Sequence, residues 1–171
     1  RFLELQLAAD LMESDEDLAA LGFLGIGPRY PPETPGLGQV VIHRPTPDEW
    51  ADQVATVTRG FLGLTVACAR CHDHFYDPVT TADYYALAGV FASLRYKDIG
   101  VDETYAKGKG WSKLVVHGVR DAKPQDLRIH LRGSDEELGE TVPRRFLTIL
   151  TPDGNPRPFT GASGRGELAA A

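Results

Sequence analysis

The sequence predicts an α+β fold that is mainly helical and carries a small β-containing extension. Apolar residues recur largely at three- and four-residue steps over residues 2–21, which is the spacing of one buried helix face. Capping sequences that begin at Thr46 and Thr80 predict two further helices. Apolar residues alternate over 113–119 and 127–131, which predicts two strands in the second half of the chain.

The composition is that of a soluble globular protein. The chain has 171 residues, 42% hydrophobic and 25% charged, enough for one domain or for two small ones that share a core. The net charge is −6 and no basic patch indicates nucleic-acid binding. The pair Arg144-Arg145 is expected on the solvated surface. No apolar run approaches the length of a membrane span.

The first predicted helix contains a break and has a defined end. Ser14 can cap a second helical turn, so the break is expected at Ser14-Asp15. The residues expected to stop the helix are Gly22, Gly25, Gly27 and Pro28. Residues 28–47 are rich in proline and glycine, which predicts a loop with at most a short strand at 40–42.

The next two helices have strong start signals. Thr46 is followed by Pro47 and two acidic residues, which predicts a helix that runs to residues 60–63. Thr80 with Asp83 three residues later forms a capping box. The predicted buried stripes are Trp50, Val54, Val57 and Phe61 on the first helix, and Tyr84, Leu87, Ala88 and Phe91 on the second.

The second half of the chain is predicted to contain a linker followed by a β-containing extension. Residues 97–112 are expected to be a linker between a helical domain at 1–96 and the β-containing extension at 113–171. A turn at 123–126 separates the two strands. The predicted buried positions on them are Leu114, Val116, Leu127, Ile129 and Leu131. Residues 164–171 resemble the start of a helix, so we expect a piece of a longer protein.

Both cysteines lie in one stretch, Cys-Ala-Arg-Cys-His-Asp-His at 68–74. Cys-x-x-Cys-His is the attachment pattern of c-type haem. Two thiols at this spacing can each form a thioether to one vinyl group, and the next imidazole can bind the iron. We therefore predict haem c tethered by Cys68 and Cys71, with His72 as the proximal iron ligand. Because haem c is attached outside the cytoplasm, a periplasmic or cell-surface location is expected.

Two other interpretations of this stretch stay open. A zinc site is the main alternative, because Cys68, Cys71, His72 and His74 offer four ligands within seven residues. Its weakness is that so short a loop would be cramped around one tetrahedral ion. A disulfide or a redox Cys-x-x-Cys ranks third, since the strand-then-helix context of thioredoxin-like motifs is absent.

Neighbouring residues have candidate roles around a haem. Arg70 is expected to pair with a propionate, ahead of Arg59 and Arg95. His74 is too close in sequence to His72 to reach the opposite face of one ring, but it remains a candidate for another ligand role, for orienting a propionate or for packing. Met12, His43, His117 and His130 are candidate distal ligands, although an ordinary structural role is more frequent for each.

A further set of side chains could surround the haem. Asp73 and Asp77 could hydrogen-bond an imidazole, or could form turns. Tyr84, Tyr85 and Phe61 could form the walls of the pocket, although a core stripe would look the same.

A set of segments matches a known family, at 8–11, 22–29, 52–54, 61–74, 77–78 and 83–87. Through these segments the chain resembles the planctomycete cytochrome-associated domain of unknown function. Segments 131–133, 139–146 and 161–168 resemble the start of the partner domain that usually follows. The resemblance implies a large secreted bacterial protein, often with a separate cytochrome c domain. Phe75 departs from it, because the family more often has Lys or Pro there.

These observations predict a cytochrome c module that transfers electrons. The expected partner is a redox protein or a neighbouring haem domain, and a homo-oligomer or surface assembly is left open. One alternative is a haem enzyme that acts on peroxide or oxidises polysaccharide. The other is a structural or carbohydrate-associated surface domain with a Cys/His metal site.

Overall fold

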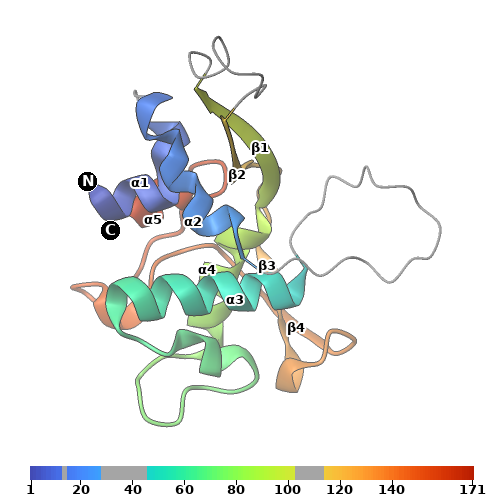
Figure 1. The fold of residues 1–171 in the computed structure, drawn as a ribbon. Helices are drawn as coiled ribbons and strands as arrows, with labels where there is room; N and C mark the ends of the chain where they lie inside the picture. Colours follow the sequence, from blue (N-terminus) through green and yellow to red (C-terminus); the bar gives the residue numbers. More distant parts are fainter. Residues whose placement is uncertain (13–14, 28–45, 103–113) are drawn as a thin grey trace, which may run out of the picture.

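The computed structural model describes residues 1–12, 15–27, 46–102 and 114–171, with the side chains of 15–16, 98–102 and 114–115 excepted. The predicted break at Ser14 and most of the predicted loop at 28–47, including His43, lie outside these residues. Within them the structure combines helices with two small antiparallel sheets (Figure 1). The predicted α+β class is confirmed.

The helices and strands follow one another in alternating groups. The α-helices are α1 (Phe2–Ala8), α2 (Gly22–Gly25), α3 (Pro47–Val57), α4 (Thr81–Ala92) and α5 (Arg165–Ala170). Short 3-10 segments span Ala9–Leu11, Asp15–Leu21, Val66–Arg70, Leu131–Gly133 and Thr148–Leu150, and a π-helical turn spans Thr58–Leu62. The strands are β1 (Leu94–Asp102), β2 (Leu114–Asp121), β3 (Leu127–His130) and β4 (Leu138–Val142).

The N-terminal region is more broken than its periodicity predicts. Helix α1 ends at Ala8, and 3-10 segments replace the rest of the predicted helix. Gly22 begins α2, so the prediction that it stops the helix is wrong. A Cβ at Gly25 would collide with the carbonyl group of His117 in β2. The close approach of α2 to this strand therefore requires glycine, and packing rather than helix termination explains that residue.

Helices α3 and α4 confirm the capping signals. The hydroxyl of Thr46 accepts from the backbone N–H of Glu49, whose carboxylate accepts from the Thr46 N–H at 2.8 Å. Thr80 and Asp83 form the same reciprocal pair at 3.1 and 3.0 Å. The π-helical turn extends α3, and Gly63 ends it in the left-handed region at φ 67°. Helix α4 is buried on every side from Asp83 onward, so it forms the centre of the molecule.

The two predicted strands do not pair with each other. β2 pairs with β1, and β1 includes residues 97–102, which were expected in the linker. β3 pairs with β4. The prediction that Leu131 is buried is wrong, because its side chain is 46% exposed whereas His130 is buried. A register shift between Arg128 and His130 changes which side chains face the core, and an alternating pattern cannot anticipate it.

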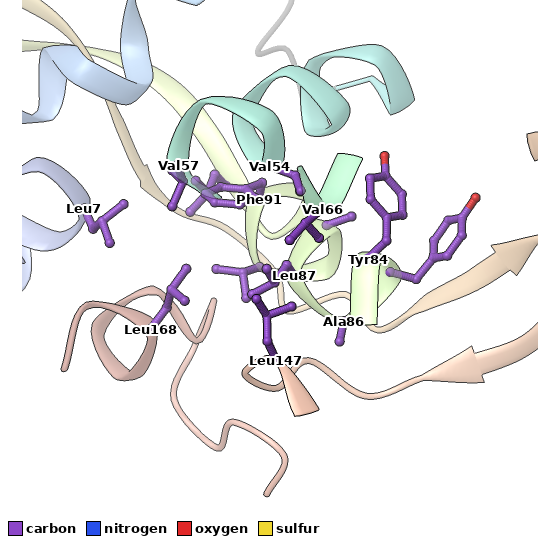
Figure 2. Packing of buried hydrophobic residues seen from close by; sticks show 14 of the residues in the cluster. Leu7, Val54, Val57, Val66, Tyr84, Ala86, Leu87, Phe91, Leu147 and Leu168 are labelled. Atoms are coloured by element: carbon purple, nitrogen blue, oxygen red, sulfur yellow. The ribbon is translucent and has the colours of Figure 1, made fainter. Parts of the chain in front are cut away.

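One hydrophobic cluster contains side chains from both halves of the chain. Figure 2 shows side chains of α1, α3 and α4 meeting Leu147 and Leu168 of the C-terminal region. Val119 of β2 and Val142 of β4 belong to the same cluster. The two predicted domains therefore share a core, and the position of the boundary between them stays a prediction.

The prediction that Arg144 and Arg145 lie on the solvated surface is wrong. Arg144 is buried, and its Nε lies 2.9 Å from the Asp126 carboxylate. Arg145 lies 2.7 Å from Asp83 in α4. Burial would raise the pKa of Asp83, but hydrogen bonds from Thr148, Thr80 and Arg145 outweigh it and lower the pKa to about 2. Both arginines pair with carboxylates distant in sequence, which explains why Arg144 is buried and Arg145 is partly buried.

A second buried cluster of charges joins the two ends of the chain. Arg165 of α5 is 0% exposed and donates to Asp10 at 2.8 and 2.9 Å, to Asp121 at 2.9 Å and to the Leu7 carbonyl at 3.0 Å. Arg120 of β2 also pairs with Asp10, at 3.0 Å. The cluster therefore connects α1, β2 and α5. Among the described helices, none has the length and apolar character to cross a membrane.

Candidate functional site

The Cys-His stretch occupies the connection between α3 and α4, at the bottom of the view in Figure 1. Its first part is the 3-10 segment Val66–Arg70, which begins where the Cys68 N–H donates to the Thr65 carbonyl at 3.0 Å. Val66 and Ala69 point into the core and are both buried. This orientation turns Cys68 and Cys71 outward, and both are exposed, free thiols.

The His72 side chain, directly after Cys71, has one of its two ring nitrogens in a hydrogen bond. The Nδ1 atom lies 2.7 Å from the backbone carbonyl of Asp73, so it carries the hydrogen and donates it. The lone pair of the neutral ring is then on Nε2. A backbone carbonyl that accepts from one nitrogen fixes the ring and raises the basicity of the other, as is usual for histidines that bind metals. The exposed His72 therefore presents a potential ligand atom.

His74 uses both of its ring nitrogens within the protein. Nδ1 accepts from the backbone N–H groups of Tyr76 at 3.2 Å and Asp77 at 2.8 Å. Nε2 therefore carries the hydrogen, which it donates to the hydroxyl of Thr65 at 2.9 Å. The ring connects the two ends of the loop. In this conformation neither nitrogen is available to coordinate a metal, and His74 acts as a structural anchor.

The remainder of the loop is fixed to α4 and carries two exposed aromatic rings. The Asp73 carboxylate accepts from the backbone N–H of Thr81 at 2.8 Å, so the side chain of Asp73 holds the loop, whereas its backbone carbonyl holds the His72 ring. Asp77 contributes its backbone N–H to His74 and also lies 3.5 Å from Nδ1 of that ring. Phe75 and Tyr76 are 82% and 87% exposed, with their rings edge to face at 4.8 Å.

The side chain of Arg70 reaches from the motif to α3. Its guanidinium donates to Asp48 at 2.8 Å, and its backbone carbonyl accepts from the Tyr85 hydroxyl at 3.2 Å. Burial lowers the pKa of Arg70, but the hydrogen bond and the charge of Asp48 outweigh this and raise it above its ordinary value. The other two candidate cations, Arg59 and Arg95, are exposed on the π-helical turn and on β1.

Comparison with known proteins places the chain in a family. The family PSCyt2, described as a protein of unknown function (DUF1549), matches residues 1–96. The chain belongs to this family. The PSCyt2 match covers α1 to α4 and the whole Cys-His stretch. No curated protein and no solved structure matches the chain.

One wall of the site comes from beyond the PSCyt2 match. His130, at the end of β3, is buried with its ring 5.3 Å from that of Tyr85 and 6.5 Å from that of Trp50. Burial is the largest cause that lowers the pKa of His130, and the Arg70 cation adds to it. The neutral imidazole is therefore favoured. Gly133 lies directly against the Cys71 sulfur. The sequence suggested His130 only as one distal ligand among several, and it gave no signal for Gly133.

The aromatic residues expected around the site divide into two groups. Tyr84 and Tyr85 lie beside Arg70 and Cys71, and burial raises the pKa of both phenols. Phe61 instead stacks on Phe23 at 5.1 Å and lines a separate apolar cavity of about 320 Å³. Only the two tyrosines therefore belong to this site.

The remaining candidate ligands are spread over the molecule. Met12 follows the first 3-10 segment near the N-terminus, and His117 lies on β2, in the sheet at the upper part of Figure 1. His43 lies outside the described residues. In the described part of the chain, no three His, Cys, Asp or Glu side chains are grouped so that they could hold a metal ion. The four ligands of the zinc interpretation do not converge in this conformation.

Proposed function

We propose that Cys68 and Cys71 carry a covalently attached haem, that His72 is its proximal iron ligand, and that the protein transfers electrons. The observation that carries this proposal is the geometry of His72. Its Nδ1–H donates to the Asp73 carbonyl at 2.7 Å, which leaves the lone pair of Nε2 as a potential ligand atom in a motif with two exposed thiols.

The surrounding residues suit such a group. Each thiol would add across one vinyl double bond, with the sulfur bonding to one carbon and the hydrogen going to the other, so that no oxidant is required. Phe75 and Tyr76 offer exposed apolar rings directly after the motif, and Arg70 offers a cation for a carboxylate. When bound, haem supplies a reversible one-electron couple.

The proposal extends to the cellular setting. Covalent haem attachment requires an extracytoplasmic location, so we place the protein in the periplasm or at the cell surface. Its partner would be a redox protein or a neighbouring haem domain. The resemblance of residues 131–168 to the domain that usually follows this one belongs to the same proposal.

An absorption spectrum tests the proposal directly. The protein, produced in a host that matures cytochromes c, should show a sharp reduced α-band and haem that survives denaturing electrophoresis. Cys68→Ala/Cys71→Ala should lose the covalent haem, whereas Phe2→Ala, an exposed residue of α1, should retain it. A colourless wild-type protein would overturn the proposal, and zinc analysis would then test the metal-site alternative. A high-spin haem that binds cyanide would favour the enzymatic alternative.

A further inference from the structure

The turn between β3 and β4 has a strained backbone next to Cys71. Arg132 lies at φ 56° and ψ 22°, the left-handed region that residues other than glycine rarely adopt. In the described part of the chain it is the one non-glycine residue with positive φ. Gly133 follows at φ 80°. A methyl group at position 133 would lie 2.5 Å from the Cys71 sulfur, closer than real Cβ atoms come to other atoms.

The turn is fixed from both sides. The Leu131 N–H donates to the Glu137 carbonyl at 2.8 Å, and the Ser134 N–H donates to the Leu131 carbonyl at 3.0 Å. His130, which precedes the turn, is buried against Tyr85. The turn therefore occupies a set position over Cys71, and the strain of its backbone is compensated by the packing of its neighbours.

We infer that the Leu131–Gly133 turn is part of the binding site on Cys71, with Gly133 as a positioning residue. Its bare Cα leaves the space that the Cys71 sulfur occupies, so that the thiol can keep this position when a group is attached to it. A binding site confined to the PSCyt2 match would then lack one wall, which residues outside the match supply. The identity of the attached group rests on the proposed function, but the effect of Gly133 on the thiol does not.

Thiol labelling tests the inference on the full chain produced without haem. The probe is N-ethylmaleimide, and peptide mass spectrometry gives the labelling rate of Cys71 relative to that of Cys68. Gly133→Ala should lower this ratio severalfold, because a methyl group would crowd the sulfur. Gly154→Ala is the matched control, since Gly154 has a similar φ of 62° but open space around it. An equal ratio in the two variants would overturn the inference.

A double-mutant cycle separates the steric contact from general strain. Gly133→Ala should raise the equilibrium constant of unfolding in both backgrounds. The rise should be about tenfold larger when Cys71 is present than in the Cys71→Ala background. If Gly133→Ala fails to fold, Gly133→Ala/Cys71→Ala should fold, because the opposing sulfur is gone. Failure of both, or equal destabilisation in both backgrounds, would contradict a contact with the sulfur.

Haem attachment distinguishes this inference from the proposed function. In a host that matures cytochromes c, Gly133→Ala should carry haem on Cys68 alone, seen by mass spectrometry of the haem peptide. Two thioethers in Gly133→Ala would overturn the inference and leave the proposed function intact. A wild-type protein without haem would overturn the proposed function, and the labelling ratio would still decide the role of Gly133.

Discussion

The Cys-His stretch and the buried ion pairs differ in what they expose to solvent and in how they are held. The stretch displays Cys68, Cys71 and His72 to solvent, and neutral hydrogen bonds through His74 fix its loop. The buried clusters around Arg165 and Asp83 instead remove full charges from water and satisfy them with several partners.

This difference distinguishes residues that stabilise the fold from exposed residues that are available to bind or react. A buried charge that loses its partner remains uncompensated, so substitutions in the clusters should be costly. Replacement of an exposed side chain usually changes the free energy of unfolding of the protein little. The Cys-His stretch can therefore change its chemistry while the two halves of the chain stay joined by their ion pairs.

Replacement of Arg165 should be the most damaging change. Arg165→Met would leave Asp10 and Asp121 without their buried cation. In the described part of the chain, Arg120 would be the one remaining cation paired with Asp10. We expect a loss of about 3–5 kcal/mol in the free energy of unfolding, measured by urea denaturation.

An exposed ion pair provides the control for Arg165. Arg1 pairs with Asp17 at 2.8 Å, but its side chain is 71% exposed. Arg1→Met should cost less than about 1 kcal/mol, because solvent screens the pair. Similar losses in Arg165→Met and Arg1→Met would contradict the claim that burial distinguishes these clusters.

The next largest effect should be a dependence on acid at Asp83. Its pKa is about 2 in the folded protein against 3.8 for the free side chain. Because the folded-state pKa is lower, its contribution is complete above about pH 5 and is lost as the pH falls through 2. The loss should be about 2 kcal/mol.

Urea denaturation between pH 6 and pH 2 measures this term. Asp83→Asn should be less stable than the wild type at pH 6, and the difference should shrink as the pH falls. If the unfolding free energy of Asp83→Asn fell with decreasing pH as steeply as that of the wild type, the acid sensitivity would come from other carboxylates.

Local signals predicted much of this fold, because they act over a few residues. The capping boxes at Thr46 and Thr80 specify their helices through hydrogen bonds three residues apart. The motif at 68–74 was visible because both cysteines lie in it. In each case the sequence window holds all the interacting groups.

Long-range contacts account for what the sequence did not predict. β2 pairs with β1 and lies against Gly25 of α2, and the alternating pattern of the strand specifies neither contact. The approach of Gly133 to Cys71 joins residues 62 positions apart, and it follows a register shift between Arg128 and His130 that no local pattern indicates. The burial of Arg165 likewise depends on carboxylates at distant positions.

Two histidines of the same stretch should differ in their effect on stability. His74→Ala would leave the backbone N–H groups of Tyr76 and Asp77 without their acceptor, so we expect a loss of about 1–2 kcal/mol in the unfolding free energy. His72→Ala should cost less than about 0.5 kcal/mol in the protein without haem, since the ring is exposed. Equal losses in urea denaturation would show that His74 does not anchor the loop.

The smallest effect should come from the cysteines themselves. In the protein produced without haem, Cys68→Ser should change the free energy of unfolding by less than about 0.5 kcal/mol, because the side chain is exposed. The Cys71→Ser change should be similarly small, since an oxygen replaces the sulfur beside Gly133 without adding bulk. Each substitution should remove one of the two thioethers, and the double substitution should remove covalent haem. These variants would thus lose function while keeping stability, whereas Arg165→Met would lose stability. A large loss of stability in either serine variant, measured by urea denaturation, would mean that the thiols help to hold the fold.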